Sequence, residues 1–303
     1  MVNLVKNIGI IGMHDEGNGH PYSFSAIING YNRKHFEAAN WPGILKYLES
    51  RDEKEFGIEG FKITHAWTQD INITKKLCAA CKIPHLVNKP FDMSGKIDAL
   101  IVARDDMHAE IAMPFLKNKT PVFIDKPLTI NKKELNSFIP FLKNGTLMST
   151  SGLRFAAELD QIRSKLPEIL PIRLITATVV NELDRYGIHM LDALDSLELL
   201  SVNKVKRLDA KYDSFQLQCN NNSIILLNCL GSVNRTFHLS IFGEKGHIHT
   251  NLHDNFTAFK RTLGHFSKMV KDKVPPVPPQ TVVKNMNLIR KCKNLKPNQT
   301  FSL

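Results

Sequence analysis

The pattern of apolar and polar positions predicts alternating strands and helices through the first half of the chain. Continuous apolar runs at 99–103 and 122–124 are typical of strands buried on both faces of a parallel sheet. Between them, residues 107–117 place apolar side chains at helical spacing. The other predicted strands are 7–12, 61–68, 83–87 and 147–151, and the other predicted helices are 22–29, 43–48, 71–81 and 131–143. This alternation predicts a doubly wound parallel sheet, a Rossmann-type α/β domain, over residues 1–150.

The pattern changes after residue 151, where strands follow one another with few helices between them. The predicted strands are 172–180, 205–212, 215–219, 224–230, 235–242 and 247–250, and the predicted helices are 156–166, 188–200 and 281–293. Turn-forming residues at 220–222 and 243–246 favour antiparallel pairing. Residues 151–303 are therefore expected to form an α+β domain with a mostly antiparallel open sheet.

One segment of the first domain, residues 31–60, is longer than a simple crossover between strands needs. We interpret it either as a lid near a ligand pocket or as a packing extension of the domain.

Polar side chains gather where two of the predicted parallel strands end. Arg104 and Asp105 follow the strand 99–103, and Asp125 and Lys126 close the next strand. His108 opens the helix between them. Ligands of open α/β sheets bind outside the carboxyl ends of the strands, so these residues are candidates for chemistry on topology alone.

A partial dinucleotide fingerprint follows the first strand. Gly12 and Gly17 occupy the first and third glycine positions of G-x-G-x-x-G, but His14 occupies the second. A side chain there implies a changed loop, a shifted cofactor or no dinucleotide. Asp70, after the second strand, is placed either to bind ribose hydroxyls, which favours NAD over NADP, or to cap the next helix.

Three segments carry a family resemblance. The stretch Val-Phe-Ile-Asp-Lys-Pro-Leu at 122–128 resembles the strand with the Glu-Lys-Pro motif of the Gfo/Idh/MocA oxidoreductases, with Asp125 in the Glu position. His108 is similar to the histidine that opens the preceding helix in that family, and 187–192 is similar to its Gly-x-His-x-x-Asp segment. The resemblance implies an NAD(P)-dependent dehydrogenase or reductase. Such an enzyme transfers a hydride between nicotinamide and the CH–OH carbon of a sugar, a polyol or a sugar derivative.

The resemblance also implies two catalytic residues. Lys126 would stabilise alkoxide charge or relay a proton, although an exposed Lys–Asp pair is the alternative. His189 would act as a general acid or base, although a structural histidine beside an apolar helix is the alternative. The implied cofactor contacts, for NAD with NADP also possible, are Gly12, His14, Gly17, Asp70, Ala103, Arg104, His108, Asp125 and Lys126.

A departure from the family pattern lies next to His189. Many members carry a carboxylate four residues before this histidine, where the chain has Arg185. Either Asp184 replaces that carboxylate, or His189 works with Lys126 alone, or Arg185 binds an anionic group of the substrate, which we prefer. The expected substrate contacts are Arg154, Asp184, Arg185 and Asp192.

Two of these substrate contacts have structural alternatives. Asp192 either orients His189 or caps the helix or pairs elsewhere. Arg154 lies where the domains are expected to meet, either as a cleft residue or in an interdomain ion pair.

Composition narrows the class of partner. The 303 residues carry a net charge of +11, but the basic residues are scattered, which favours small anionic ligands over nucleic acid. The five cysteines, the absence of a secretory start and the absence of an apolar run of membrane length predict a cytoplasmic protein without a membrane anchor. We expect no metal site, because the histidines lack ligand spacing. An open sheet face needs cover, so a homo-oligomer, dimer or tetramer, is expected.

Two other functions remain open on the sequence. A non-catalytic binding or regulatory protein on the same fold would explain His14. An enzyme that retains NAD for elimination or hydrolysis is the third hypothesis.

Overall fold

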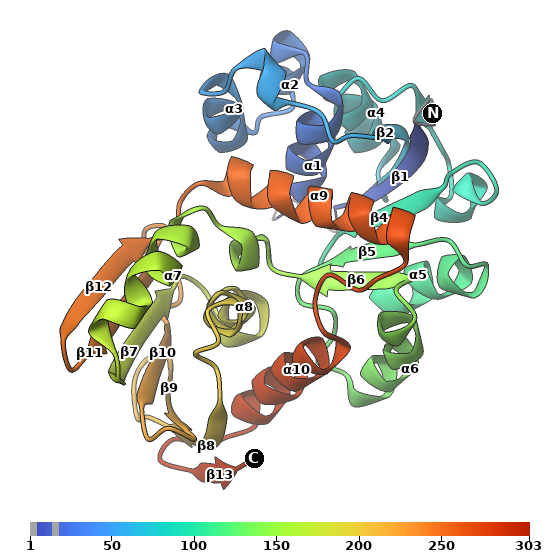
Figure 1. Cartoon of the computed structure of the whole chain (residues 1–303). Helices are drawn as coiled ribbons and strands as arrows, with labels where there is room; N and C mark the ends of the chain where they lie inside the picture. Colours follow the sequence, from blue (N-terminus) through green and yellow to red (C-terminus); the bar gives the residue numbers. More distant parts are fainter. Residues whose placement is uncertain (1–4, 14–17) are drawn as a thin grey trace. The chain divides into compact units, whose positions relative to one another are not determined.

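The computed structural model describes residues 5–13 and 18–303 and divides into two compact units (Figure 1). The first unit comprises Met1–Leu128, Lys133–Thr150 and Phe259–Pro279. The second comprises Thr129–Lys132, Ser151–Ala258 and Gln280–Leu303. A segment from the last third of the chain therefore belongs with the N-terminal unit.

The first unit is built on six parallel strands in the order β3-β2-β1-β4-β5-β6. They are β1 (Lys6–Gly12), β2 (Phe61–Trp67), β3 (His85–Leu86), β4 (Ala99–Ala103), β5 (Val122–Asp125) and β6 (Leu147–Thr150). Strand β4 is fully buried, as its continuous apolar run predicts. The predicted doubly wound parallel sheet is confirmed.

Helices of the first unit follow the strands in alternation. They are α1 (His20–Asn29), α2 (Arg33–Ala38), α3 (Pro42–Glu49), α4 (Ile71–Ala80), α5 (His108–Lys117) and α6 (Lys132–Lys143), with short turns η1 (Glu53–Glu55) and η2 (Pro90–Met93). Strand β3 has only two residues, where the sequence predicts five.

The long segment between α1 and β2 is a packed part of the first unit. The Trp41 ring lies 5.8 Å from the Tyr22 ring of α1, and the Tyr47 hydroxyl donates to Ser23 Oγ at 2.6 Å. Phe36 of α2 is fully buried. Helix α1 is consequently buried along nearly its whole length.

Helix α9 (Asn255–Asp272), which the sequence pattern did not predict, crosses the sheet of the first unit. Its Phe259 ring packs edge-on against Phe24 of α1 at 5.1 Å. Its Phe266 ring lies 5.6 Å from Phe61 and 5.8 Å from Phe123. The helix was not predicted, although its apolar residues recur at helical spacing between lysine, arginine and histidine.

The second unit contains a seven-stranded sheet in the order β12-β11-β7-β10-β9-β8-β13. Its strands are β7 (Ile172–Val179), β8 (Val202–Arg207), β9 (Asp213–Cys219), β10 (Ile224–Cys229), β11 (Phe237–Gly243), β12 (Gly246–Asn251) and β13 (Thr300–Ser302). The pairing is mostly antiparallel, as predicted, with one parallel pair between β7 and β10. That pair is parallel because the chain between these strands crosses over through a helix and two further strands.

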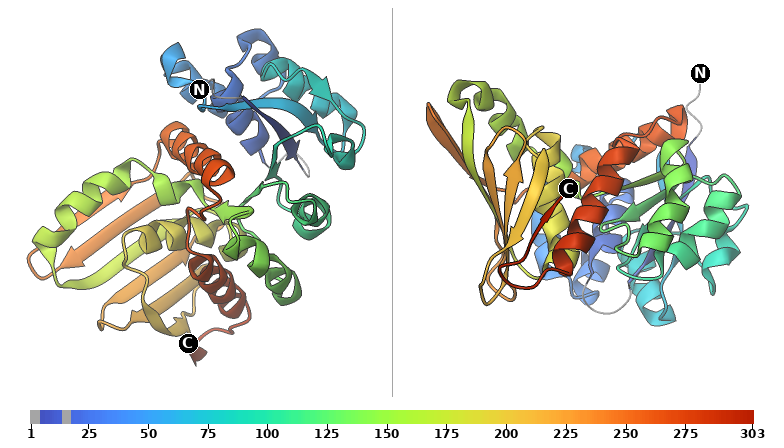
Figure 2. Two further views of the ribbon diagram at one scale, coloured as in Figure 1. Left: turned by 45° about the vertical axis from the view of Figure 1, so that its right-hand side comes forward. Right: turned by 90° about the horizontal axis from the view of Figure 1, so that it is seen from below.

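Helices cover one face of this second sheet (Figure 2). They are α7 (Glu158–Ile169), α8 (Ile188–Ser196) and α10 (Pro279–Lys293), with the turn η3 (Gly152–Phe155) and a π-helical turn η4 (Leu183–Gly187) leading into α8. Along β7 and β10, buried residues facing the helices alternate with partly exposed ones. The second face is thus a half-exposed surface within this unit.

Two element boundaries differ from the prediction for local reasons. Helix α8 ends at Ser196, four residues early, because Glu198 adopts a left-handed backbone conformation with φ of 61°. Strand β8 spans Val202–Arg207, and the chain then turns back into β9, which begins at Asp213. In the described part of the chain, no helix is both long and apolar enough to span a membrane.

Candidate active site

The carboxyl ends of the parallel strands bring several predicted site residues to one edge of the first unit. Gly12 at the end of β1 is in register with Ala103 at the end of β4. Asp125 ends β5 in register with Thr150 of β6. The backbone alone therefore aligns the predicted cofactor contacts of this unit along one edge.

Asp125 is held by a histidine that sequence reasoning did not assign to it. The Nδ1 atom of His20 lies 2.5 Å from Asp125 Oδ2. The His20 ring is fixed in turn by ring contacts with Phe24 at 5.4 Å and Phe259 at 4.9 Å. Burial by itself would raise the pKa of the Asp125 carboxyl, but the charge of His20, its hydrogen bond and the Lys126 ammonium lower that pKa to about 2. Asp125 is therefore an ionised, buried carboxylate.

Lys126 follows directly and is 5% exposed. Its ammonium is close enough to Asp125 to help lower the pKa of that carboxyl. The expected alternative of an exposed Lys–Asp pair is therefore wrong, because both side chains are buried. We call His20, Asp125 and Lys126 the Asp125 cluster.

Arg104, at the end of β4, is the largest fully enclosed side chain of this edge, at 2% exposure. Its Nε donates to Asp106 Oδ1 at 2.5 Å, and its guanidinium lies 5.7 Å from the centre of the Trp67 ring. Its Nη1 atom is buried and has no hydrogen-bond partner within the described protein. A buried donor without a protein partner is expected at a site that binds an anionic ligand.

The surroundings of Gly12 fit a dinucleotide in a second respect. A Cβ atom at Gly12 would lie 2.3 Å from Pro21 Cγ of α1, so only glycine allows this close approach of strand and helix. Asn18 next to it accepts the His20 N–H at 2.9 Å and donates to Asp105 at 3.3 Å, which fixes the entry to α1. The helix N-terminus offers partial positive charge at this edge. The residues present thus fit an NAD-type cofactor.

Two predicted cofactor residues, His14 and Gly17, lie outside the described residues. A third, Asp70, caps α4 by accepting the Asn72 N–H at 2.7 Å, which is the structural one of its two predicted roles. Its contact with ribose stays a prediction.

His108 ties two strand ends together. Its Nε2 lies 2.6 Å from the Arg104 carbonyl oxygen and its Nδ1 lies 2.8 Å from the Leu128 carbonyl oxygen. Both ring nitrogens thus engage the backbone around the Asp125 cluster. In this geometry His108 braces the segment after β5, and its predicted cofactor contact stays a prediction.

A second polar cluster lies in the second unit and contains His189. The Oγ atom of Ser151 lies 2.6 Å from His189 Nδ1, and the Ser151 N–H donates to Asp192 Oδ2 at 2.7 Å. Asp192 Oδ1 accepts from Asn285 Nδ2 of α10 at 2.9 Å. We call Ser151, His189, Asp192 and Asn285 the His189 cluster. All four side chains are buried.

The remaining predicted substrate contacts are engaged in ion pairs or lie in the π-helical turn. Arg154 binds Asp195 at 2.9 Å within the second unit. Asp184 pairs with Lys293 of α10. Arg185 lies beside it in η4. Their roles in binding substrate stay predictions.

Sequence reasoning missed three residues that hold these clusters together. It did not pair His20 with Asp125, and it did not consider Ser151 or Asn285. The Gly-His-Pro start of α1 could have drawn attention to His20, since this histidine opens a helix at the strand-end edge. Ser151 and Asn285 left no sequence signal, because their partners are dozens of residues away.

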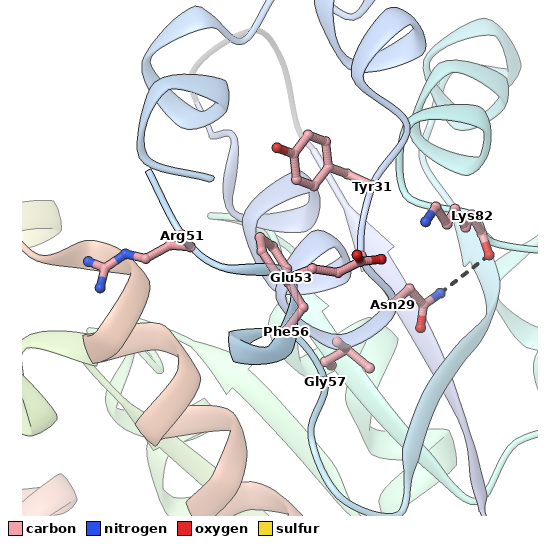
Figure 3. Close-up of a pocket in the computed structure, with 9 residues that line it drawn as sticks. Asn29, Tyr31, Arg51, Glu53, Phe56, Gly57 and Lys82 are labelled. Atoms are coloured by element: carbon pink, nitrogen blue, oxygen red, sulfur yellow. Dashed lines mark hydrogen bonds between the residues drawn. The ribbon is translucent and has the colours of Figure 1, made fainter. Parts of the chain in front are cut away.

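A cavity of about 440 Å³ opens elsewhere in the first unit, near the C-terminal end of α1 (Figure 3). Its lining residues are Ile28, Asn29, Gly30, Tyr31, Arg51, Glu53, Phe56, Gly57 and Lys82. The side chain of Arg51 points away from the other labelled residues in Figure 3. Because α1 runs back from the carboxyl edge of the sheet, this cavity lies apart from the Asp125 cluster.

Comparisons with known proteins agree with this arrangement. Residues 28–149 match the family model described as oxidoreductase family, NAD-binding Rossmann fold, of the Gfo/Idh/MocA type. The comparison with curated proteins yields no match.

Solved structures share the fold over the whole length. Scyllo-inositol dehydrogenase from Lactobacillus casei, in its apo form, aligns with a TM-score of 0.75 at 13% identity, covering 100% of this chain and 99% of that one. Myo-inositol dehydrogenase from Corynebacterium glutamicum aligns with a TM-score of 0.74 at 14% identity, covering 99% of both chains. Myo-inositol dehydrogenase from Lactobacillus casei, in complex with NAD(H) and myo-inositol, aligns with a TM-score of 0.72 at 13% identity, covering 99% of this chain and 97% of that one. At such identities the likeness concerns the fold.

Proposed function

Because residues 28–149 match the NAD-binding Rossmann domain of the Gfo/Idh/MocA oxidoreductase family, we propose that the chain transfers a hydride between nicotinamide and a CH–OH carbon of a sugar, polyol or sugar derivative. The observation that carries the proposal is the buried Lys126 beside an ionised Asp125 at the carboxyl edge of the sheet. The inositol dehydrogenases that share the fold make a cyclic polyol the first substrate class to test.

The protein residues perform binding, orientation and proton handling in this proposal. Gly12 and the start of α1 hold the pyrophosphate, and Arg104 offers its buried Nη1 donor to the dinucleotide. The bound cofactor supplies the hydride acceptor or donor. Lys126 and His189 manage the proton of the substrate hydroxyl.

The Asp125 carboxylate has the His20 ring as a partner in addition to Lys126. In this proposal the Lys126 side chain stabilises negative charge on a substrate oxygen.

Arg185 is the substrate's anion contact in this proposal. The Asp184 carboxylate already pairs with Lys293. This pairing supports Arg185, the neighbouring residue, as the one whose guanidinium binds an anionic or phosphorylated group of the substrate. The net charge of +11 agrees with an anionic ligand.

Calorimetry with NAD and NADP tests the proposal. Binding of either nucleotide, weakened by Arg104→Met, is the expected result. The rival is a regulatory protein, for which His14 at the second glycine position is the supporting observation. Absence of binding at millimolar concentrations of both nucleotides would favour that rival, whereas cofactor absorbance in the purified protein would favour an enzyme that retains NAD for elimination or hydrolysis.

The proposal includes a homo-oligomer assembled through the half-exposed face of the second sheet. Apolar side chains such as Leu174 and Leu226 alternate on that face with threonine and asparagine. Light scattering on wild type and Leu226→Lys tests this assembly, and an unchanged mass would argue against it.

The proposal also includes action in the cytoplasm. All five cysteines are free thiols, which suits a reducing compartment.

A further inference from the structure

The Arg104 guanidinium reaches along the carboxyl edge of the six-stranded sheet. Arg104 directly follows β4, yet its guanidinium lies 5.7 Å from the ring of Trp67, the last residue of β2. Strand β1 lies between these two strands in the sheet. The side chain therefore links the ends of β4 and β2 past the end of β1 at Gly12.

One edge of this guanidinium lacks a strong partner in the described part of the chain. Its Nε donates to Asp106 Oδ1 at 2.5 Å, which occupies one side of the group. Its Nη1 is buried without a hydrogen-bond partner, and its Nη2 contacts the Met107 sulfur at 4.0 Å. A thioether is a weak acceptor. The two Nη atoms thus present the parallel N–H groups with which arginine binds phosphate.

Met107 is a partner that a ligand can displace. Its side chain is 47% exposed, and an unbranched thioether adapts easily to a new position. Exchanging its sulfur for a phosphate oxygen would replace a weak acceptor by a charged one. Arg104 itself is only 2% exposed, and a guanidinium removed from water gains more from a charged acceptor than an exposed one does.

The end of β2 is the place at which dinucleotide-binding sheets distinguish NAD from NADP. An acidic side chain there hydrogen-bonds the ribose hydroxyls of NAD, and an arginine nearby accommodates the 2′-phosphate of NADP. In this chain β2 ends on Trp67, and the first acidic residue after it, Asp70, accepts the Asn72 N–H at 2.7 Å as the N-cap of α4. One oxygen of that carboxylate is thus committed to the helix, whereas the Arg104 guanidinium lies against the last residue of the strand.

From this geometry we propose that Arg104 forms a subsite for the 2′-phosphate of NADP(H), so that the chain prefers NADP(H) to NAD(H). The inference rests on the proposed function, since it concerns the adenosine half of the same dinucleotide. The phosphate accepts from Nη1 and Nη2 and takes the place of the Met107 sulfur, while Asp106 continues to hold Nε. NAD offers only a hydroxyl at this position, which leaves the buried guanidinium edge without a charged acceptor.

This preference is compatible with the match to an NAD-binding Rossmann family. NAD and NADP share the dinucleotide that such a domain binds, and they differ in one phosphate. The inference concerns that phosphate alone.

Calorimetry on the wild-type protein compares the two cofactors without needing turnover. We expect NADP to bind about tenfold more tightly than NAD or better, as a charge-assisted bidentate contact provides. Adenosine 2′,5′-bisphosphate should likewise bind more tightly than adenosine 5′-monophosphate, which locates the difference in the 2′-phosphate. NAD binding that equals or exceeds NADP binding would overturn the inference and leave the proposed function standing.

Variants assign the preference to Arg104. Arg104→Met should bring the Kd values of the two cofactors to within about threefold of each other, mainly by weakening NADP binding. Arg104→Lys keeps the charge but loses the planar fork, so it should retain only part of the preference. The melting temperature of each variant shows whether it is folded, and the wild-type comparison stands without them.

Arg51→Met is the matched control. It removes an arginine of the first unit that pairs with Glu55 at 3.7 Å and lines the cavity near the C-terminal end of α1. The ratio of the two Kd values should stay as in the wild type. A ratio that is unchanged in folded Arg104→Met, or that is lost equally in Arg51→Met, would overturn the inference.

Turnover separates the subsite from the reaction. If the proposed dehydrogenase function holds, Arg104→Met raises KM for NADP by about tenfold or more and changes kcat little, because the 2′-phosphate takes no part in hydride transfer. A preference for NADP in calorimetry without any hydride transfer would refute the proposed function and leave the subsite standing. Failure of the wild type to bind either cofactor would overturn both.

Discussion

The Asp125 cluster and the His189 cluster are both buried polar sites, but they are held in different ways. In the first, an ionised carboxylate is compensated by a histidine ring and an ammonium. In the second, a histidine ring is held by a neutral hydroxyl, and the nearby carboxylate is bound by a backbone N–H and an amide. The first cluster therefore depends on charge balance, and the second depends on hydrogen bonds.

This difference predicts different responses to mutation and to pH. Removing a charge from the Asp125 cluster leaves another buried charge uncompensated, which is costly for both stability and chemistry. Removing the Ser151 hydroxyl from the His189 cluster leaves a neutral ring nitrogen without that contact, which costs less.

Lys126→Met should produce the largest effect. The variant loses both the positive charge and the proton-handling group at the substrate oxygen, so kcat should fall by about 10³-fold or more. Initial rates of nicotinamide reduction with a panel of cyclic polyols measure this. Circular dichroism and the melting temperature check that the fold is intact, and retained activity in a folded variant would refute the role of Lys126.

His189→Gln should rank second. Glutamine keeps a hydrogen-bond donor near the Nε2 position but loses the ring geometry that Ser151 fixes, so kcat should fall by about 10²-fold. The ratio of the two losses in kcat shows whether Lys126 or His189 contributes more to handling the substrate proton. A loss larger than that of Lys126→Met would assign the larger contribution to His189.

Asp125→Asn tests the charge balance of the first cluster through acid stability. The pKa of Asp125 is lowered from 3.8 to about 2, so its ionised form stabilises the fold above pH 4 and this contribution disappears as pH falls toward 2. About two pKa units correspond to about 2 kcal/mol of unfolding free energy. Urea unfolding of wild type and variant between pH 5 and pH 2 should therefore show a pH-dependent difference that vanishes at the acid end.

The exposed pair of Lys6 and Asp98 provides the matched control for that experiment. Both side chains are more than a third exposed and 3.4 Å apart, so Asp98→Asn should change stability by less than about 1 kcal/mol. An equal acid response in Asp98→Asn and Asp125→Asn would mean that the buried pair has no special stabilising role.

Asp184→Asn should have the smallest effect of the series. Because its carboxylate pairs with Lys293 at the surface of the second unit, we expect kcat to fall by less than about tenfold. A loss comparable to that of His189→Gln would revive the hypothesis that Asp184 replaces the missing family carboxylate.

The two clusters also differ in how far the sequence could predict them. Asp125 and Lys126 were predictable because the apolar run of a buried parallel strand ends at these polar residues. Ligands of open α/β sheets bind at the carboxyl ends of such strands. The partnership of His20 with Asp125 was not, since it depends on how α1 packs against Phe259 of α9, a helix that was not predicted.

In the second unit the sequence indicated that His189 and Asp192 are neighbours on one helix, because residues three positions apart lie on the same helical face. It did not indicate Ser151 as a partner of the imidazole, because Ser151 is 38 residues away and is brought close only by the turn η3. Local periodicity predicts elements and the faces they bury, whereas contacts between distant turns depend on tertiary packing.

A crystal structure after soaking with NAD would show whether the carboxyl edge of the six-stranded sheet binds the cofactor beside Lys126. We expect density for the dinucleotide along this edge, with the adenosine half near Arg104 and the nicotinamide ring within contact distance of the Lys126 side chain. Dinucleotide density that leaves this edge empty, or a nicotinamide ring remote from Lys126, would contradict this expectation.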